Sequence, residues 1–152
     1  DRYVLRVARA KVEAALAVLS GKADRPLLSA DTAVTLDGHI LGKPRDRADG
    51  LAMLARLSGR THQVLSALAL WTPDGVRQAL STSTVTFRAI APEEAAVYWE
   101  TQEPADKAGA YAIQGCGAVF VERLEGSYSG VMGLPLYEMA QLLTQAGIRI
   151  LK

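Results

Sequence analysis

Asp31 is the first residue of this sequence whose surroundings suggest chemistry. It lies inside the apolar segment PLLSADTAVTL, residues 26–36, and Thr32 follows it directly. A carboxylate in such a segment needs partners, because desolvating it without them costs several kcal/mol. Two interpretations stay open. The side chain accepts backbone N–H hydrogen bonds at a strand end, or it projects from that strand end into a cleft as a general base or a metal ligand.

Two lysines lie in settings that suit phosphate binding. In ILGKPRD, the glycine before Lys43 lets the backbone pass close to a ligand, and the proline after it stiffens the chain. The G-x-x-x-x-G-K-[ST] phosphate loop is absent, so a solvated surface lysine is the competing interpretation. Lys107 lies beside Asp106 and near Glu103. This group is either a surface ion-pair cluster or a metal-binding carboxylate next to a phosphate-binding lysine.

Gln114 is the candidate for reading a nucleobase. It lies in EPADKAGAYAIQGCG, residues 103–117, a segment with three glycines, one proline and no clear hydrophobic period. Irregular backbone exposes donors and acceptors, so loops of this kind often carry function. The side-chain amide of Gln114 offers both a donor and an acceptor, which suits the edge of a pyrimidine or a purine.

Histidine and cysteine chemistry is disfavoured. The chain has two histidines and one cysteine, which makes a histidine-based metal site improbable and excludes internal disulfides and multi-cysteine zinc sites. His62, at the start of an expected strand, is interpreted as structural. Cys116 has no histidine or charged residue beside it, and we predict a buried, unreactive side chain.

Composition places the chain among single-domain globular proteins. It has 152 residues, of which 49% are hydrophobic and 22% charged, so residues 1–152 are expected to form one domain. The net charge of +1 disfavours a nucleic-acid partner. There is no apolar run of the roughly 20 residues that a bilayer requires and no signal-peptide pattern, so we expect no membrane partner and a cytoplasmic protein.

Hydrophobic periodicity and turn residues predict alternating helices and strands. Helices are expected over 2–19, with Asp1 as cap and Gly21 as stop signal, over 47–57 after the Asp46 cap, from Pro92 to near Thr101, and over 135–146. Strands are expected over 26–36, 39–41, 61–71, 76–89, 118–124 and 148–151, with loops over 103–117 and 125–134. Two hairpins, at Asp37-Gly38 and at residues 72–75, interrupt a strict β-α-β alternation, which favours a mixed sheet covered by helices over a purely parallel one.

Five sequence blocks in order carry a family resemblance. They are ADT, LGKP, LSGRTHQV, DKAGAY-IQG and GSY-V-GLPL, within a similarity from about Tyr3 to Gly147. Together they resemble the Maf family of nucleotide pyrophosphatases. The resemblance implies a Maf/ITPase-like α/β fold, with an elongated mixed β-sheet flanked by helices and a cleft between two lobes.

The resemblance also implies an activity and roles for five residues. The activity is hydrolysis of a nucleoside triphosphate to the monophosphate and pyrophosphate, aided by a divalent cation, magnesium or manganese. Asp31 matches the proton acceptor and is a candidate ligand of that metal, Lys43 and Lys107 match lysines that face the phosphates, and Thr32 and Gln114 match positions linked to base selection. The loop DKAGAYAIQG is similar to the branch that acts on dTTP and UTP, in which some members accept modified pyrimidine nucleotides. The expected partner is therefore a small nucleoside triphosphate, and a homodimer is the expected assembly.

One block of the family pattern is missing from this sequence. The family begins with a strand and an S-x-x-R-R type motif, whereas this sequence begins at the first expected helix. We therefore expect this sequence to be a fragment of a longer gene product, a sequence whose start is misassigned, or a shortened relative of the family. The alternative to an active enzyme is therefore a non-catalytic or weakly active nucleotide-binding relative with a regulatory role linked to septum formation.

Overall fold

The structure, a computed structural model, describes residues 1–19 and 25–151. The helix stop signal predicted at Gly21 lies outside the described residues. The elements are helices α1 (Arg2–Val18), α2 (Arg47–Leu57), α3 (Pro92–Glu100), α4 (Tyr128–Met132) and α5 (Leu136–Gln145), strands β1 (Leu27–Leu36), β2 (His39–Leu41), β3 (Thr61–Thr72), β4 (Gly75–Phe87) and β5 (Val121–Glu125), and 3-10 helices η1 (Glu103–Asp106), η2 (Ala108–Ala110) and η3 (Cys116–Phe120). None of the helices within the described ranges is long and apolar enough to cross a membrane.

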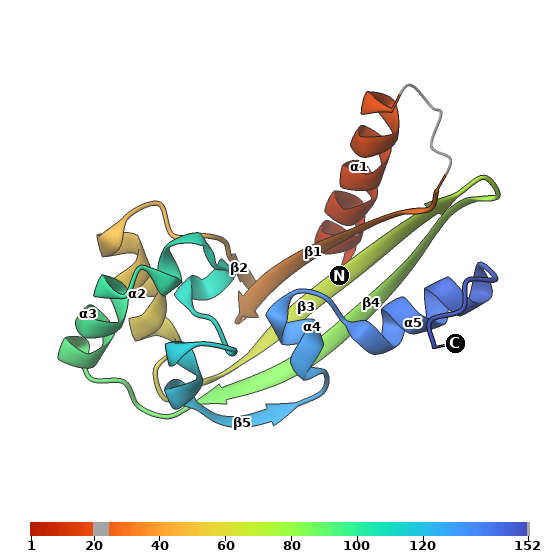
Figure 1. Ribbon diagram of the computed structural model, residues 1–152. Helices are drawn as coiled ribbons and strands as arrows, with labels where there is room; N and C mark the ends of the chain where they lie inside the picture. The colour runs from red at the N-terminus through yellow and green to blue at the C-terminus, as the bar shows by residue number, and fades with distance from the viewer. Residues whose placement is uncertain (20–24, 152) are drawn as a thin grey trace. The chain divides into compact units, whose positions relative to one another are not determined.

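The five strands form one sheet in the order β2-β1-β3-β4-β5 (Figure 1). Strands β1 and β2 pair antiparallel, as do β4 and β5, and the strand arrows alternate in direction across the sheet. The prediction of a mixed sheet is therefore wrong in this respect. Two tight turns join neighbouring strands directly, and such turns produce antiparallel pairs. At the first of them, Asp37 and Gly38 have φ of 51° and 77°, as the favoured two-residue hairpin turn requires.

The chain divides into two compact units, which we describe separately. Unit 1 comprises residues 1–32, 65–81 and 129–152, and unit 2 comprises residues 33–64 and 82–128. Strands β1, β3 and β4 each contribute residues to both units.

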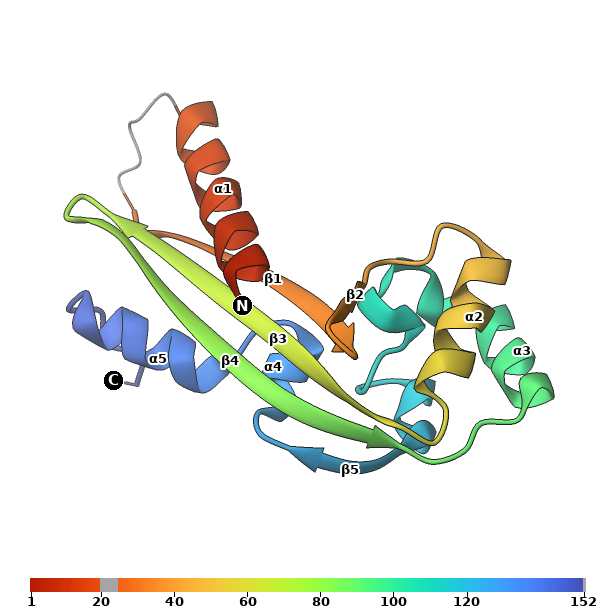
Figure 2. The same ribbon diagram turned by 180° about the vertical axis from the view of Figure 1, so that it is seen from behind.

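Unit 1 has helices on both faces of its part of the sheet. Successive strand residues point to opposite faces. On β1, the Ser29 hydroxyl donates to the Ala8 carbonyl oxygen of α1 at 2.6 Å, whereas Ala30 packs on the cluster of Leu68, Leu70 and Leu142, the last from α5. Helices α1 and α5 therefore cover opposite faces, as the reverse view in Figure 2 shows. This double cover explains why β3 is buried along most of its length.

Unit 2 is built around aromatic side chains. Phe87 on β4 is 1% exposed, and its ring packs at 4.7 Å from the centroid of Tyr111 and 4.9 Å from that of His62. Helices α2 and α3 approach closely because residue 50 is glycine. A Cβ atom there would lie 2.1 Å from the Trp99 ring. Helix α2 begins as predicted, with the Asp46 carboxylate accepting the Asp49 backbone N–H at 2.8 Å.

Three predicted segments differ in the structure. The segment expected as a strand from residue 118 begins instead with η3, and the extended chain starts at Val121. The loop expected over 125–134 contains α4, a single turn too short to show a hydrophobic period. No strand forms within 148–151, because the chain turns back after α5. There Gly147 has φ of 75° and the Ile148 N–H donates to the Leu143 carbonyl at 2.9 Å.

His62 makes the stability of the protein depend on pH. Burial lowers the pKa of its imidazole from the ordinary 6.5 to about 4. Between these values the unfolded chain binds more protons than the folded protein, so stability is expected to fall as the pH drops through this window, by at most about 3 kcal/mol. Urea unfolding of the wild type and of His62→Leu, between about pH 7 and about pH 4.5, measures the effect. A free-energy difference between the two proteins that stays constant with pH would contradict the assignment.

Candidate active site

Asp31 lies in the interior of β1 and forms an ion pair with a helix. The Lys11 ammonium of α1 donates to Asp31 Oδ1 at 2.8 Å and to the Ala30 carbonyl oxygen at 3.0 Å. Both sequence interpretations placed Asp31 at a strand end, and both are wrong on this point, because the strand continues to Leu36. The partner is a charged side chain rather than a backbone N–H. The Asp31 side chain is 15% exposed, and its Oδ2 makes no hydrogen bond with another described residue.

Thr32 begins a short chain of hydroxyl groups within unit 1. Its Oγ1 lies 2.7 Å from the Oγ of Ser66 on β3, and Ser66 donates to the Gly130 carbonyl oxygen at 2.6 Å. Ser66 has a single hydroxyl proton, which goes to Gly130, so Thr32 must be the donor to Ser66. The free side of the Thr32 oxygen then carries lone pairs only.

Lys43 and Lys107 lie near one another in unit 2. The Gly109 N–H donates to the Gly42 carbonyl oxygen at 3.0 Å, which joins the segment after β2 to the loop after η1. Lys107 pairs with the Asp106 carboxylate. The hydrogen bond from Lys107, and then the charges of Lys107 and Lys43, lower the pKa of Asp106 against the opposing effect of desolvation. Two ammonium groups therefore act on one exposed carboxylate.

Glycine is required where these two segments meet. Gly109 has φ of 72°, a left-handed conformation, and a Cβ atom there would lie 3.0 Å from the Val34 side chain. The hydrogen bond to Gly42 and the position of Lys107 both depend on this close approach.

Gln114 lies in a tight turn and is exposed. The turn runs from Ala112 to Gly115 and is closed by the Gly115 N–H, which donates to the Ala112 carbonyl oxygen at 3.3 Å. Ile113 beside it is 6% exposed and anchors the turn. Within the described part of the chain, the Gln114 amide forms no hydrogen bond with another residue, so its donor and acceptor are free for a ligand.

Glu103 holds the same loop through backbone contacts. Its carboxylate accepts the backbone N–H groups of Cys116 at 2.8 Å and Gly117 at 3.0 Å, and the Tyr98 hydroxyl at 2.7 Å. Desolvation opposes its ionisation, but these hydrogen bonds outweigh that effect and lower the pKa of Glu103. Glu103 was expected in a surface ion-pair or metal-binding cluster, and its part in holding this loop was not predicted.

Two further residues named from the sequence have different outcomes. His62 is structural in its setting, since it is 2% exposed and its Nε2 lies 2.9 Å from the Tyr111 hydroxyl. The prediction of a buried Cys116 is wrong, because the side chain is exposed. Its backbone N–H donates to Glu103 Oε2 at 2.8 Å.

The structure groups the predicted site residues by unit. Asp31 and Thr32, with Lys11 and Ser66 as partners, belong to unit 1, and Lys43, Lys107 and Gln114 belong to unit 2. Lys11 and Ser66 were missed because their importance appears only once α1 and β3 pack beside β1. Among residues 1–19 and 25–151, no three histidine, cysteine, aspartate or glutamate side chains gather closely enough to hold a metal ion.

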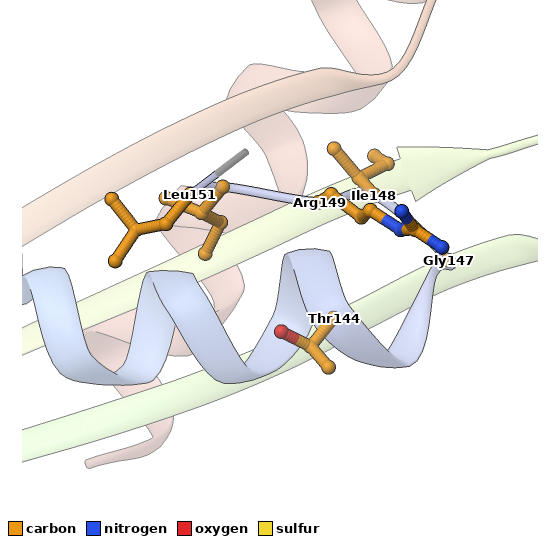
Figure 3. A pocket seen from close by; sticks show the side chains of 6 residues that line it. Thr144, Gly147, Ile148, Arg149 and Leu151 are labelled. Atoms are coloured by element: carbon orange, nitrogen blue, oxygen red, sulfur yellow. The ribbon is translucent and has the colours of Figure 1, made fainter.

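A hollow beside the C-terminal turn has a different character. It is lined by Thr144, Gly147 and the segment 148–151, and Figure 3 shows mostly aliphatic side chains there. Among the described residues that line it there is no carboxylate and one cation, Arg149, so this lining lacks the groups that would activate water.

Comparison with known proteins identifies the family. Residues 1–146 match the family model described as Maf-like protein. The chain is 60% identical to a dTTP/UTP pyrophosphatase of Burkholderia thailandensis, over 97% of this chain and 72% of that protein. It is 55% identical to the protein of that name in Cupriavidus pinatubonensis and 52% identical to that in Methylobacillus flagellatus, which it covers to 76% and 75%. The chain belongs to the Maf family.

Proposed function

We propose that this chain is a nucleoside triphosphate pyrophosphatase that hydrolyses dTTP and UTP to the monophosphate and pyrophosphate. The observation that carries the proposal is the 60% identity, along nearly the whole chain, to a relative that bears the name dTTP/UTP pyrophosphatase. The five residues to which the family resemblance gives roles all lie within the part of the chain that matches the family model.

Asp31 is the proposed general base. Water forms a bond to the α-phosphorus while the bond from that phosphorus to the bridging oxygen breaks, and the oxygen leaves with pyrophosphate. The proton of the water passes to the Asp31 carboxylate. The Lys11 ammonium engages Oδ1 at 2.8 Å, which leaves Oδ2 to take the proton. Base catalysis of this kind contributes on the order of 10² to 10⁴ in rate.

Lys43 and Lys107 are the proposed phosphate ligands. Negative charge develops on the leaving pyrophosphate, and ammonium groups fixed before the reaction stabilise it. Lys107 is paired with Asp106 in this structure, so a bound phosphate would replace a carboxylate that is exposed and easily rehydrated. Such exposed ion pairs contribute little stability, and exchanging the partner costs little.

The residues present fit a divalent cation that arrives with the nucleotide. Magnesium bound to phosphates typically needs only one or two protein carboxylates. Asp31, whose side chain is 15% exposed, would be its ligand in unit 1, as the alternative to its role as the base. When bound, the cation would neutralise phosphate charge and make the phosphorus more electrophilic.

Pyrophosphate release from a nucleotide panel tests the proposal. The expected result is release from dTTP and UTP with magnesium or manganese, and incorporation of oxygen from labelled water into the monophosphate. Release no higher than that of Asp31→Asn would contradict it. Binding of dTTP without turnover would instead support the non-catalytic alternative.

Gln114 is proposed to select the base, and Gln114→Glu tests this role. The amide can donate to O4 and accept from N3–H of thymine or uracil, whereas a carboxylate cannot donate. We expect the variant to lose about tenfold in kcat/KM for dTTP and UTP, as for removal of a buried hydrogen bond. Gln114→Ala, which removes both the donor and the acceptor of the amide, is the comparison variant. Unchanged selectivity in Gln114→Glu would show that other residues read the base.

A further inference from the structure

The turn that presents Gln114 is fixed by two side chains that do not belong to it. The Tyr98 hydroxyl accepts the Ala112 N–H at 3.1 Å and donates to Glu103 Oε1 at 2.7 Å. The two carboxylate oxygens of Glu103 then accept the N–H groups of residues 116 and 117 at 2.8 and 3.0 Å. One Tyr–Glu pair therefore holds the chain on both sides of Gln114.

The pair fills space that other residues would need. A Cβ atom at Gly115 would lie 2.1 Å from Glu103 Oε2, and one at Gly117 would lie 2.6 Å from the Tyr98 hydroxyl oxygen. A Cβ atom does not come this close to another non-hydrogen atom, so both glycines are needed for the pair to reach the backbone. In the sequence, the two glycines that this arrangement requires appear directly after Gln114, as Q-G-C-G.

The approach of Glu103 to the loop is itself constrained. Gln102, directly before it, has φ of 62°, an uncommon conformation for a non-glycine residue. The Glu103 N–H donates to the Thr101 hydroxyl at 3.2 Å, and that hydroxyl donates to the Tyr98 carbonyl oxygen at 2.7 Å. Strained backbone of this kind is found where a side chain must be held in one place.

We propose that Tyr98 and Glu103 are positioning residues for base selection, which set the discrimination among nucleotides by fixing the Gln114 amide without touching the nucleotide. This inference rests on the base-reading role proposed for Gln114. Two hydrogen bonds to a base edge form together only if the amide plane is held, and an amide on a mobile turn loses that discrimination. Tyr98 is 4% exposed and its ring packs edge-on against Phe120 at 5.1 Å, so the support is rigid.

Tyr98→Phe tests the inference, because it removes the bridging hydroxyl and keeps the packed ring. We expect a roughly tenfold rise in KM for dTTP with a smaller change in kcat, and a lower dTTP to dCTP ratio of kcat/KM, from the loss of a buried hydrogen bond. In a Gln114→Ala background the same change is expected to have no further effect on selectivity, since the residue being positioned is gone. Tyr137→Phe is the matched control, as it removes an exposed tyrosine hydroxyl that accepts a hydrogen bond from Gln141.

A second readout does not depend on turnover. Hydrogen exchange of the segment 111–118 is expected to be faster in Tyr98→Phe and in Glu103→Gln than in the wild type and in Tyr137→Phe. Unchanged exchange, or a selectivity loss that adds to that of Gln114→Ala, would overturn the positioning role. Wild-type protein without pyrophosphate release would instead overturn the proposed function, while faster exchange in the two variants would still support a loop held by Tyr98 and Glu103.

Discussion

Asp31→Asn is expected to reduce pyrophosphate release from dTTP by about 10² to 10⁴-fold, the range over which a positioned general base contributes. Asparagine keeps the size of the side chain and an oxygen that can accept from Lys11. It removes the capacity to take a proton at the position of Oδ2. The measurement is kcat for dTTP and UTP at saturating metal, with thermal unfolding recorded in parallel.

Two comparisons make this result specific to the Asp31 carboxylate. Asp74→Asn removes a carboxylate from the turn between β3 and β4 in the same unit and is expected to keep wild-type activity. Lys11→Met leaves the Asp31 carboxylate but removes its partner at 2.8 Å, and we expect a smaller loss. An Asp31→Asn enzyme within a few-fold of the wild type would exclude Asp31 as the base.

Lys107→Met is expected to lower kcat/KM for dTTP by about 10² to 10³-fold, the range measured when one fixed donor to a developing negative charge is removed. Methionine is close to lysine in length and replaces the ammonium with an apolar group. The effect is expected in kcat as well as KM, because charge grows on the leaving group during bond cleavage. Steady-state kinetics over a range of dTTP concentrations separates the two constants.

Asp106→Asn is the matched control for this prediction. Both substitutions break the Lys107–Asp106 ion pair, but Asp106→Asn leaves the ammonium in place. We expect this variant to keep most of its activity. A loss as large as that of Lys107→Met would indicate instead that Asp106 binds the metal, which is the interpretation left open by the sequence.

Local sequence signals predicted most of the elements and the family. The Asp46 cap and the Asp37-Gly38 turn have their expected places in the structure. Helix α1 and strands β1 and β3 also lie within a residue of their expected bounds. The order of five blocks predicted the Maf family, which the family model confirms. Signals of this kind act over a few residues or through linear order, so they can be read without knowledge of packing.

Contacts between distant residues account for what was missed. Lys11 reaches Asp31 from 20 residues away, and Glu103 reaches the backbone of Gly117 from 14 residues away. The hydrophobic periodicity of a short segment does not predict such pairs. Cys116 was predicted to be buried from its residue type, yet its side chain is exposed and its backbone N–H is bound by the Glu103 carboxylate, 13 residues away. The pairing of β1 with β3 likewise joins strands that are not consecutive in the sequence, and the strand pattern does not reveal it.

The hydroxyl chain from Thr32 through Ser66 to Gly130 has a direction, and that direction has a consequence for chemical recognition. Its protons run toward the Gly130 carbonyl, so a group that meets the open side of the Thr32 oxygen has to bring a proton of its own. Amide, amino and hydroxyl groups meet this requirement, whereas carbonyl and phosphate oxygens, which only accept hydrogen bonds, do not.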